Sequence, residues 1–209
     1  MAVAQRPQFW LLPLAADTPL WISKQERRWS ETLPPNLRQR YCMSRGQLRA
    51  QLAALLHQPA LTVPLHSPPA QRPRLAEGHG YVSISHSRDQ LLLAWSPWPI
   101  GVDLEWQQRP LQAEALAQRF FPEPEWQRLQ LLAPPARRVA VLESWVCKEA
   151  AIKWQGSSLA SDLRHWEWDR ERQQLRHLKQ GWSPRCRREQ RDGWLCAVVG
   201  EAAEQGIWG

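Results

Sequence analysis

Asp103 and Glu105 are two carboxylates separated by one residue, in the segment PIGVDLEW that spans 99–106. Apolar residues alternate with other residues along this segment, which predicts a β-strand with both acids on one face. Like charges this close repel one another unless a cation joins them. Magnesium and similar hard divalent ions prefer oxygen ligands of this kind. The pair therefore indicates a metal site, although a solvated strand face is the commoner context for an isolated D-x-E pattern.

A third carboxylate, Glu149, lies in the stretch SWVCKEAAIKWQG at 144–156. Apolar residues at helical spacing predict a helix that begins at Pro135 and stops at Gly156. Glu149 and Lys153 continue the apolar stripe, so Glu149 is expected to face inward. A buried carboxylate is costly unless it is paired or bound to a metal. Either a Glu149–Lys153 salt bridge or a second charge facing a ligand would account for this pattern.

Lysine is scarce in this chain, with four residues against twenty-three arginines. Two of the four, Lys148 and Lys153, fall in the same predicted helix. A compact ammonium suits contacts with phosphate oxygens or proton transfer, so this placement favours a phosphate site, with chance clustering as the alternative. His86 in ISHS and Arg72 in QRPRL are candidate phosphate-binding residues only if they lie near such a site. Taken alone, a histidine is usually structural and a loop arginine is usually solvated.

The composition indicates a soluble globular protein with an anionic partner. The chain has 209 residues, of which 43% are hydrophobic, so it can bury a core in one large domain or two small ones. The formal net charge of +7 favours phosphate, nucleic acid or an acidic protein surface as the partner. The four cysteines form no C-x-x-C pair, which fits a reducing cytoplasm. No apolar run approaches the roughly 18 residues of a membrane span.

The remaining sequence predicts the elements that must position these side chains. Ser44 is expected to cap an amphipathic helix that ends near His57. The segment 9–16 is expected to form a buried strand, and the proline-rich segment 60–80 an extended loop. Periodicity and chain breakers predict further strands at 81–87, 90–96, 166–169 and 194–200, and a helix over 111–121.

Four motifs occur in a fixed order along the chain: ISHS, IGVDLE, RFFPEPEW and WVCKEAAIK. Together they resemble the 4′-phosphopantetheinyl transferases, specifically the larger single-chain type that activates surfactin-type peptide synthetases and fatty-acid carriers. The resemblance runs from about Arg72 to Gly156, and the pairing of G-V-D-x-E with W-x-x-K-E-A-x-x-K makes it specific. It implies transfer of the phosphopantetheine arm of coenzyme A to a carrier-protein serine, with release of adenosine 3′,5′-bisphosphate and with magnesium on the pyrophosphate.

The resemblance implies a role for each polar residue in these motifs. Three carboxylates would be the magnesium ligands: Asp103, Glu105 and Glu149. Five basic residues would bind coenzyme A: Arg49, Arg72, His86, Lys148 and Lys153. The catalytic residues would be Glu149, Lys153 and Glu125, with Glu149 the first candidate for the general base that accepts the serine proton and Glu125 the second. The chain departs from the family pattern in having QRP where G-K-P is common, and Val146 where a small residue is usual.

The resemblance also implies an α+β fold of two similar halves related by a pseudo-twofold axis, each a small sheet packed with a long helix. The N-terminal half, 1–100, would supply contacts to coenzyme A and the carrier. The C-terminal half, 101–209, would supply the metal-binding acids and the long helix. The protein would be a cytoplasmic monomer that acts on an acidic apo acyl or peptidyl carrier protein, with no nucleic acid or membrane partner. Arg137 and Arg138 are among the arginines expected to attract that carrier.

Two other functions are compatible with the composition. A basic nucleic-acid-binding module would use the fourteen tryptophans to stack on bases, but it leaves the three acids unexplained. A metal-dependent phosphodiester hydrolase would use the same acids. It would also need a second metal cluster to activate water, and the sequence offers no obvious one.

Overall fold

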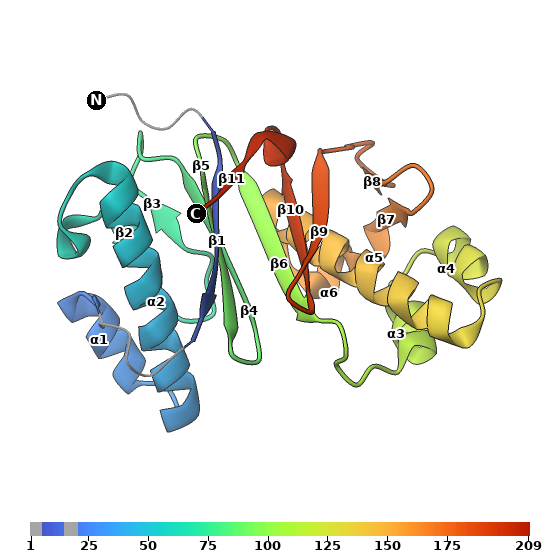
Figure 1. The fold of residues 1–209 in the computed structure, drawn as a ribbon, viewed down its shortest axis with the longest axis horizontal. Coiled ribbons are helices and arrows are strands. Elements are labelled where there is room, and N and C mark those ends of the chain that lie inside the picture. The colour runs from blue at the N-terminus through green and yellow to red at the C-terminus, as the bar shows by residue number, and fades with distance from the viewer. Residues whose placement is uncertain (1–5, 15–20) are drawn as a thin grey trace.

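Two antiparallel sheets occupy the middle of the molecule, and a 22-residue helix lies on the outer side of each (Figure 1). The computed structural model describes residues 6–14 and 21–209. Helix α2 (Pro35–Leu56) covers the first sheet, and helix α5 (Pro134–Gln155) covers the second. The layers therefore follow the order helix, sheet, sheet, helix, which is a mixed α+β organisation as the resemblance implies.

The strands of the first sheet follow the order β11-β1-β5-β4, and those of the second follow β6-β10-β9. Neighbouring strands are antiparallel, except that β1 and β11 are parallel. The first sheet contains β1 (Gln8–Pro13), β4 (Tyr81–Ser87), β5 (Gln90–Ser96) and β11 (Ile207–Trp208). The second contains β6 (Ile100–Trp106), β9 (Cys186–Arg191) and β10 (Trp194–Gly200). Because β11 pairs with β1, the last residues of the chain return to the first sheet.

Shorter elements lie around these layers. The helices are α1 (Lys24–Glu31), α3 (Ala113–Phe120), α4 (Glu123–Gln130) and α6 (Leu159–Asp162). Two small hairpins pair β2 (Leu65–His66) with β3 (Arg74–Leu75) and β7 (Trp166–Asp169) with β8 (Gln174–His177). Helix α5 ends as predicted at Gly156, whose φ of 80° is in the left-handed region that glycine adopts readily.

Apolar side chains fill each of the three interfaces between layers. Leu48 and Leu52 of α2 pack on the outer face of the first sheet. Leu92 of β5 and Val102 of β6 belong to the core between the two sheets. Val146 of α5 belongs to the core on the outer face of the second sheet, together with residues of β7 and β10. The apolar side chains of β6, those of Ile100, Val102 and Leu104, all belong to the core between the sheets, and the alternate residues face the opposite side.

Gly101 allows α5 to approach β6 closely. A Cβ atom at this position would lie 2.0 Å from the carbonyl oxygen of Ala150 and 2.3 Å from the backbone nitrogen of Trp154. Both are helix backbone atoms, so no change of rotamer could relieve the contact. Because side chains alternate along a strand, Asp103 and Glu105 share the α5-facing side of β6 with Gly101. The close contact therefore sets the spacing between the two acids and α5.

A buried ion pair joins α4 to α5. The Nζ atom of Lys148 lies 2.6 Å from Glu125 Oε2, and the exposed fractions of the two residues are 0% and 2%. The ammonium also lies 3.5 Å from the centre of the Phe121 ring. Glu125 accepts a hydrogen bond from the backbone N–H of Trp168 at 3.3 Å and another from the Ser144 hydroxyl. Burial lowers the pKa of Lys148 to about 8, although the carboxylate opposes this shift.

Helix α2 starts earlier than the sequence predicts. It begins at Pro35, and Ser44 lies buried inside it, where the hydroxyl donates to the carbonyl of Tyr41 at 3.0 Å. Ser44 is therefore not the cap, because Pro35 occupies the first helical position, which proline favours. The strand predicted over 9–16 corresponds to β1, and residues 15 and 16 lie outside the described residues.

Three of the four cysteines and five of the fourteen tryptophans are buried. All four cysteines are free thiols, which agrees with the absence of a disulfide framework in the sequence prediction. Trp95, Trp166 and Trp168 are among the largest fully buried side chains. Within residues 6–14 and 21–209, none of the helices has the length and apolar character that a bilayer crossing requires.

We expect Gly101→Ala to lower the free energy of unfolding by about 2–3 kcal/mol, because the new methyl group meets helix backbone that cannot yield. Gly181→Ala is the matched control, since a Cβ there meets nothing within 4 Å and only the left-handed backbone, at a φ of 69°, adds strain. That strain costs about 1–2 kcal/mol. Urea denaturation measures both. A loss at Gly101 no greater than that at Gly181 would contradict the close-packing argument.

We expect Lys148→Met and Glu125→Gln each to destabilise the protein by about 3–5 kcal/mol, because each leaves a buried charge without its partner. The double variant should be destabilised by much less than the sum, since it leaves neither charge unpaired. A double-mutant cycle in urea gives the coupling energy. Arg172→Met is the control, because its ion pair with Asp169 is exposed and should contribute less than about 1 kcal/mol. Additive losses at Lys148 and Glu125 would rule out the coupling.

Candidate active site

A polar cluster lies where β4 and β6 meet α5. Asp103 of β6 is 3% exposed, and its Oδ1 atom accepts hydrogen bonds from the Ser85 hydroxyl at 2.7 Å and from Lys153 Nζ at 2.7 Å. Lys153 also donates to Ser85 Oγ at 3.0 Å. Its ammonium therefore forms an ion pair with an acid on the strand, whereas the sequence had suggested Glu149 as a partner on the same helix.

Glu105 is the second acid on this side of β6. It is partly buried, and its Oε2 atom accepts a hydrogen bond from the Ser87 hydroxyl at 3.1 Å. Its Oε1 atom forms an ion pair with Arg109. Burial and the nearby charge of Asp103 raise the pKa of Glu105, while Arg109 acts in the opposite direction. Two side chains thus hold Glu105, and the negative charge of Asp103 still acts on its carboxylate.

Glu149 of α5 completes the cluster. Burial and the negative charges of Asp103 and Glu105 together raise the pKa of Glu149 to about 8, while Lys153 opposes this shift. These electrostatic interactions mean that the acid from the helix lies in the same field as the two acids from the strand. We refer to Asp103, Glu105 and Glu149 as the acid cluster.

The acid cluster suits a hard divalent cation. All its donor atoms are carboxylate oxygens, which magnesium prefers. The Oδ2 atom of Asp103 is buried and makes no hydrogen bond within the described part of the chain. Burial is the largest cause of the raised pKa values of Glu105 and Glu149, and the negative charge of Asp103 adds to both shifts. A cation bound to these oxygens would provide a partner for Oδ2 of Asp103 and would offset the negative charge of the acids.

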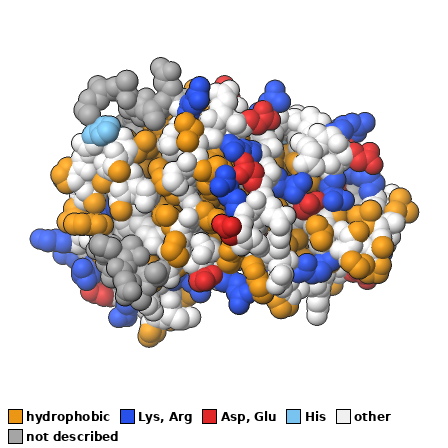
Figure 2. Space-filling model, in the orientation of Figure 1, with side chains coloured by type: hydrophobic (Ala, Val, Ile, Leu, Met, Phe, Trp, Pro, Cys, Tyr) orange, Lys and Arg blue, Asp and Glu red, His pale blue; other side chains and the backbone are white. Residues whose placement is uncertain are grey.

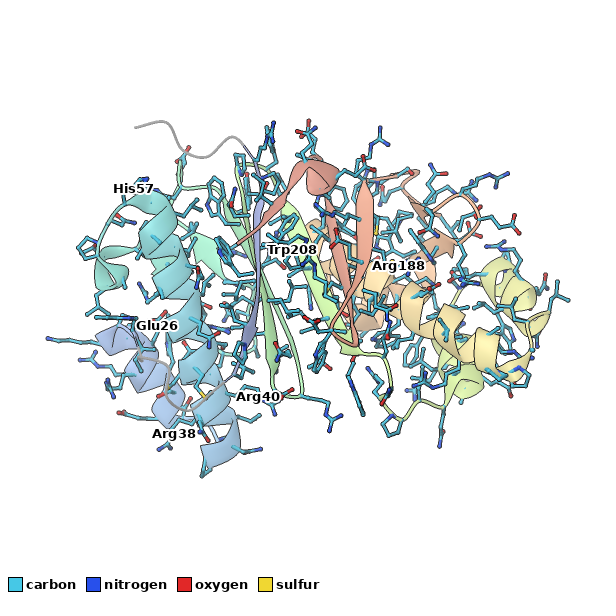
Figure 3. The ribbon with its side chains drawn as sticks, in the orientation of Figure 1. Glu26, Arg38, Arg40, His57, Arg188 and Trp208 are labelled. Atoms are coloured by element: carbon cyan, nitrogen blue, oxygen red, sulfur yellow. The ribbon has the colours of Figure 1, made fainter. Side chains whose placement is uncertain are left out.

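His86 lies on β4 between Ser85 and Ser87 and faces α2. Its Nε2 atom lies 3.4 Å from Nη1 of Arg40, which is labelled in Figure 3. Partial desolvation and the positive charges of Arg40 and Lys153 lower the pKa of His86. The pair of His86 and Arg40 therefore forms a basic group at the end of β4.

Arg72 lines a cavity of about 750 Å³ beside the C-terminal end of α5. Its guanidinium donates to the carbonyl oxygens of Ile100 at 3.2 Å and Trp154 at 3.4 Å. Burial lowers the pKa of Arg72, and the neighbouring charge of Arg74 acts in the same direction. Tyr81 also lines the cavity. No member of the acid cluster does, but Arg72 contacts both elements that carry those acids.

Arg49 uses four of its five guanidinium N–H groups on internal partners in this structure. The residue is 2% exposed, and its Nε atom pairs with Glu26 at 2.7 Å; Glu26 is labelled in Figure 3. Its other guanidinium nitrogens donate to three backbone carbonyls, those of Ala60, Val63 and Leu65. Arg49 therefore holds α1 and the segment 60–65 against α2, in place of the coenzyme A contact expected from the resemblance.

Lys148 and Glu125 also differ from the resemblance-based expectation. Their ion pair is enclosed between α4, α5 and β7, so neither side chain reaches solvent or the acid cluster. Lys148 cannot contact phosphate from this position, and Glu125 cannot accept a proton from an external serine. The difference arises because Lys148 and Glu149 are adjacent on a helix and therefore point in directions about 100° apart.

A second group of metal-ligating atoms comprises Asp162, His165 and His177. Asp162 Oδ1 lies 3.1 Å from His165 Nδ1 and 3.6 Å from His177 Nε2. Nδ1 of His177 accepts a hydrogen bond from the backbone N–H of Gln180 at 3.1 Å, so Nε2 carries the proton of the neutral ring. A ligating nitrogen needs a free lone pair, and its ring normally donates through the other nitrogen. We therefore assign no metal to this polar cluster.

The structure adds four residues that sequence reasoning missed: Arg40, Ser85, Ser87 and Arg109. The alternation in the segment YVSISHS places Ser85 and Ser87 on one face, which is a usable signal. Arg109 is four residues after Glu105, but its pairing depends on the turn after β6. Arg40 gave no signal because the helix was expected to begin at Ser44.

Comparison with known proteins agrees with the resemblance. The sequence model of the 4′-phosphopantetheinyl transferase superfamily matches residues 99–199. The chain is 31% identical over 131 residues to the 4′-phosphopantetheinyl transferase HetI of Nostoc sp. (strain PCC 7120), covering 60% of this chain and 55% of that protein. It is 35% identical over 85 residues to the 4′-phosphopantetheinyl transferase psf-1 of Bacillus pumilus, covering 40% of this chain and 35% of that protein.

The matched region contains most of the candidate site. Residues 99–199 include β6 with Asp103 and Glu105, and α5 with Glu149 and Lys153. The chain spans 55% and 35% of the lengths of the two curated relatives that it matches. The chain is therefore similar to the 4′-phosphopantetheinyl transferase superfamily over residues 99–199, the region that contains the three acids.

Proposed function

We propose that this protein transfers the 4′-phosphopantetheine arm of coenzyme A to a serine of an apo acyl or peptidyl carrier protein, releasing adenosine 3′,5′-bisphosphate. The serine oxygen forms a new bond to the phosphorus that carries the pantetheine arm. The anhydride bond between the two phosphates breaks, and the serine proton passes to a base. Positioning and charge neutralisation supply most of the catalysis in such a phosphoryl transfer.

The observation that carries this proposal is the acid cluster with Lys153 beside it, on the elements that the superfamily model matches. Carboxylates alone would repel a pyrophosphate. Carboxylates that hold a cation, next to an ammonium, would bind one. The cavity lined by Arg72 and Arg74 adds positive charge at the end of the same helix, where phosphates of coenzyme A could bind.

Asp103, Glu105 and Glu149 would hold magnesium, whose contribution there is to offset the negative charge of the pyrophosphate. The protein's own groups fix the remaining roles. Ser85 and Lys153 hold one oxygen of Asp103 and leave the other free. The Lys153 side chain is 30% exposed, so its ammonium can also contact a phosphate oxygen that enters from solvent.

Glu149 is the candidate general base. Of the two carboxylates considered for this role, Glu125 is enclosed by its pair with Lys148, whereas Glu149 is only partly buried beside Asp103. A base must lie within hydrogen-bonding reach of the serine proton, either directly or through one water. Glu149 therefore remains the residue that can accept the proton at the site where the phosphate would bind.

We further propose that the enzyme is a magnesium-dependent cytoplasmic monomer of the larger, surfactin-synthetase-activating type. The halves 1–100 and 101–209 would be related by a pseudo-twofold axis. Support for this relation comes from the two 22-residue helices, each of which begins with proline and covers the outer face of an antiparallel sheet. Strand β11 belongs to the half 101–209 but pairs with β1 in the first sheet, so the two halves are not fully separate.

An acidic carrier protein fits the excess positive charge of the chain. Figure 2 shows Lys and Arg side chains spread over the visible face among scattered acids, so a single basic patch does not define the docking surface there. Two of the arginines expected to attract the carrier have internal partners. Arg137 pairs with Glu114, and Arg138 donates to the carbonyls of Gln107 and Arg109.

The nucleic-acid alternative receives less support. Large exposed hydrophobic side chains include Trp21, Trp98 and Trp182, but these come from separate segments of the chain. Trp95 and Trp166 are fully buried and serve as core. Stacking on bases needs an aromatic platform at the surface, and most of the tryptophans do not supply one.

Incubation with coenzyme A, magnesium and a panel of apo carrier proteins tests the reaction directly. Mass spectrometry of each carrier should show a gain equal to one phosphopantetheine group. Asp103→Ala and Glu149→Gln should each reduce the rate by roughly 100-fold or more, because a metal ligand contributes several kcal/mol to the transition state. Glu123→Gln is the control, since this exposed acid lies outside the cluster. Near wild-type turnover in a folded Asp103 or Glu149 variant would remove that residue from the site.

Lys153→Met separates a catalytic lysine from a purely structural one. We expect turnover to fall by roughly 100-fold while the melting temperature in magnesium stays within a few degrees of wild type, because the cation compensates Asp103. Lys179→Met, at an exposed lysine, should change neither. Single-turnover rates and thermal melts decide between the two roles. Loss of stability in magnesium with unchanged activity per folded molecule would assign Lys153 a structural role only.

A further inference from the structure

Strands β4 and β6 are edge strands of different sheets, yet serine side chains link them. The backbone N–H of Val102 donates to Ser83 Oγ at 3.0 Å, and the backbone N–H of Leu104 donates to Ser85 Oγ at 3.3 Å. Hydroxyl groups of alternate residues on β4 thus accept the hydrogen bonds that a neighbouring strand would normally accept through its carbonyls. We call Ser83, Ser85 and Ser87 the serine ladder.

The same ladder contacts the acids of β6. The Ser85 hydroxyl donates to Asp103 Oδ1 at 2.7 Å, and the Ser87 hydroxyl donates to Glu105 Oε2 at 3.1 Å. The serines and the acids both occur at a period of two, so Ser85 lies opposite Asp103 and Ser87 lies opposite Glu105. The other face of β4 lies against α2 and carries Val82 and Ile84, which belong to the core there, and His86, which contacts Arg40. The pattern S-x-S on one strand therefore matches D-x-E on the other.

Ser85 uses its full hydrogen-bonding capacity. A serine hydroxyl has one donor and can accept two hydrogen bonds. Ser85 donates to Asp103, and it accepts from Lys153 Nζ at 3.0 Å and from the Leu104 backbone N–H. Its side chain is therefore fixed in one orientation, and that orientation occupies Oδ1 of Asp103. The Oδ2 atom stays buried and without a hydrogen-bond partner in the described part of the chain.

We propose that the serine ladder sets the register of β6 against β4 and that Ser85 and Ser87 are positioning residues for the cation ligands. Ser85 holds Oδ1 of Asp103 and leaves Oδ2 without a hydrogen bond from any described residue, whereas Ser87 and Arg109 hold Oε2 and Oε1 of Glu105 and fix the orientation of that carboxylate, whose oxygens keep further lone pairs for a cation. The positioning role rests on the proposed cation site. The register role of Ser83 does not, because Ser83 contacts only backbone.

Titration with Mn²⁺ alone, in the absence of coenzyme A and carrier, measures the positioning role without the reaction. Calorimetry or the electron paramagnetic resonance signal of free Mn²⁺ reports the affinity. We expect Ser85→Ala to weaken Mn²⁺ binding roughly 10-fold to 100-fold, the usual effect of removing a partner that orients a ligand. Ser87→Ala should have a smaller effect because Arg109 still holds Glu105, and Ser87→Thr should restore the affinity because it keeps the hydroxyl.

Two further variants separate positioning from general stability. Ser83→Ala should lower the urea midpoint and change Mn²⁺ affinity less than Ser85→Ala does. Ser67→Ala is the matched control, since Ser67 is fully buried and its hydroxyl has no hydrogen-bond partner among the described residues. If Ser85→Ala fails to fold, the comparison of Ser87→Ala with Ser87→Thr carries the same test. Wild-type Mn²⁺ affinity in both folded alanine variants would overturn the positioning role.

The outcomes distinguish this inference from the proposed function. Absence of Mn²⁺ binding in the wild-type protein would overturn the positioning role together with the cation site. Loss of Mn²⁺ binding in Asp103→Ala but not in Ser85→Ala would overturn the positioning role of Ser85. The proposed transfer reaction would be unaffected by that result. Weakened binding in Ser85→Ala, with no transfer to any carrier by the wild-type protein, would support the ladder and count against the proposed reaction.

Discussion

The carboxylate of Asp103 is buried at the junction of the two sheets, and a charge in that position requires compensation. Its compensation comes from two other elements: a hydroxyl on β4 and an ammonium on α5. Each of these groups must be held within about 3 Å of one oxygen atom. The arrangement of β4, β6 and α5 can therefore vary little, because a small displacement of any one of them would leave a buried charge unpaired.

The packing of α5 on β6 meets this requirement through Gly101. The helix backbone occupies the space of a side chain at that position, so the long Lys153 side chain can extend along the strand to Asp103. Helix α5 carries two lysines with different roles. Lys148 is enclosed and joins α4 to the core, whereas Lys153 is partly exposed at the acid cluster. The scarcity of lysine in the sequence pointed to both positions, but it could not separate the packing role from the site role.

Patterns of period two and 3.6 were sufficient to predict the strands β4, β5, β6 and β10 and the end of α5. They also predicted that Asp103 and Glu105 share a face and that Glu149 faces inward from a helix, whereas the grouping of all three acids came from the resemblance. They failed where the outcome depends on contacts between distant segments. Ser44 has the chemistry of a helix cap but lies inside α2, and Arg49 has the charge of a phosphate ligand but pairs with Glu26, 23 residues away. Partners such as these depend on tertiary packing, which local spacing does not encode.

The groups that would hold substrate and those that would hold the cation share one structural unit. Arg72 comes from the loop between β2 and β3, but its guanidinium donates to the first residue of β6 and to the last turn of α5. The acids lie further along β6 and one to two turns back along α5. A displacement of α5 relative to β6 would break the hydrogen bonds of Arg72 and the ion pair of Lys153 together. Transfer of a phosphoryl group depends mainly on positioning. Because Arg72 and Lys153 are both held by the contact between α5 and β6, the distance between the cavity lined by Arg72 and the acid cluster stays fixed.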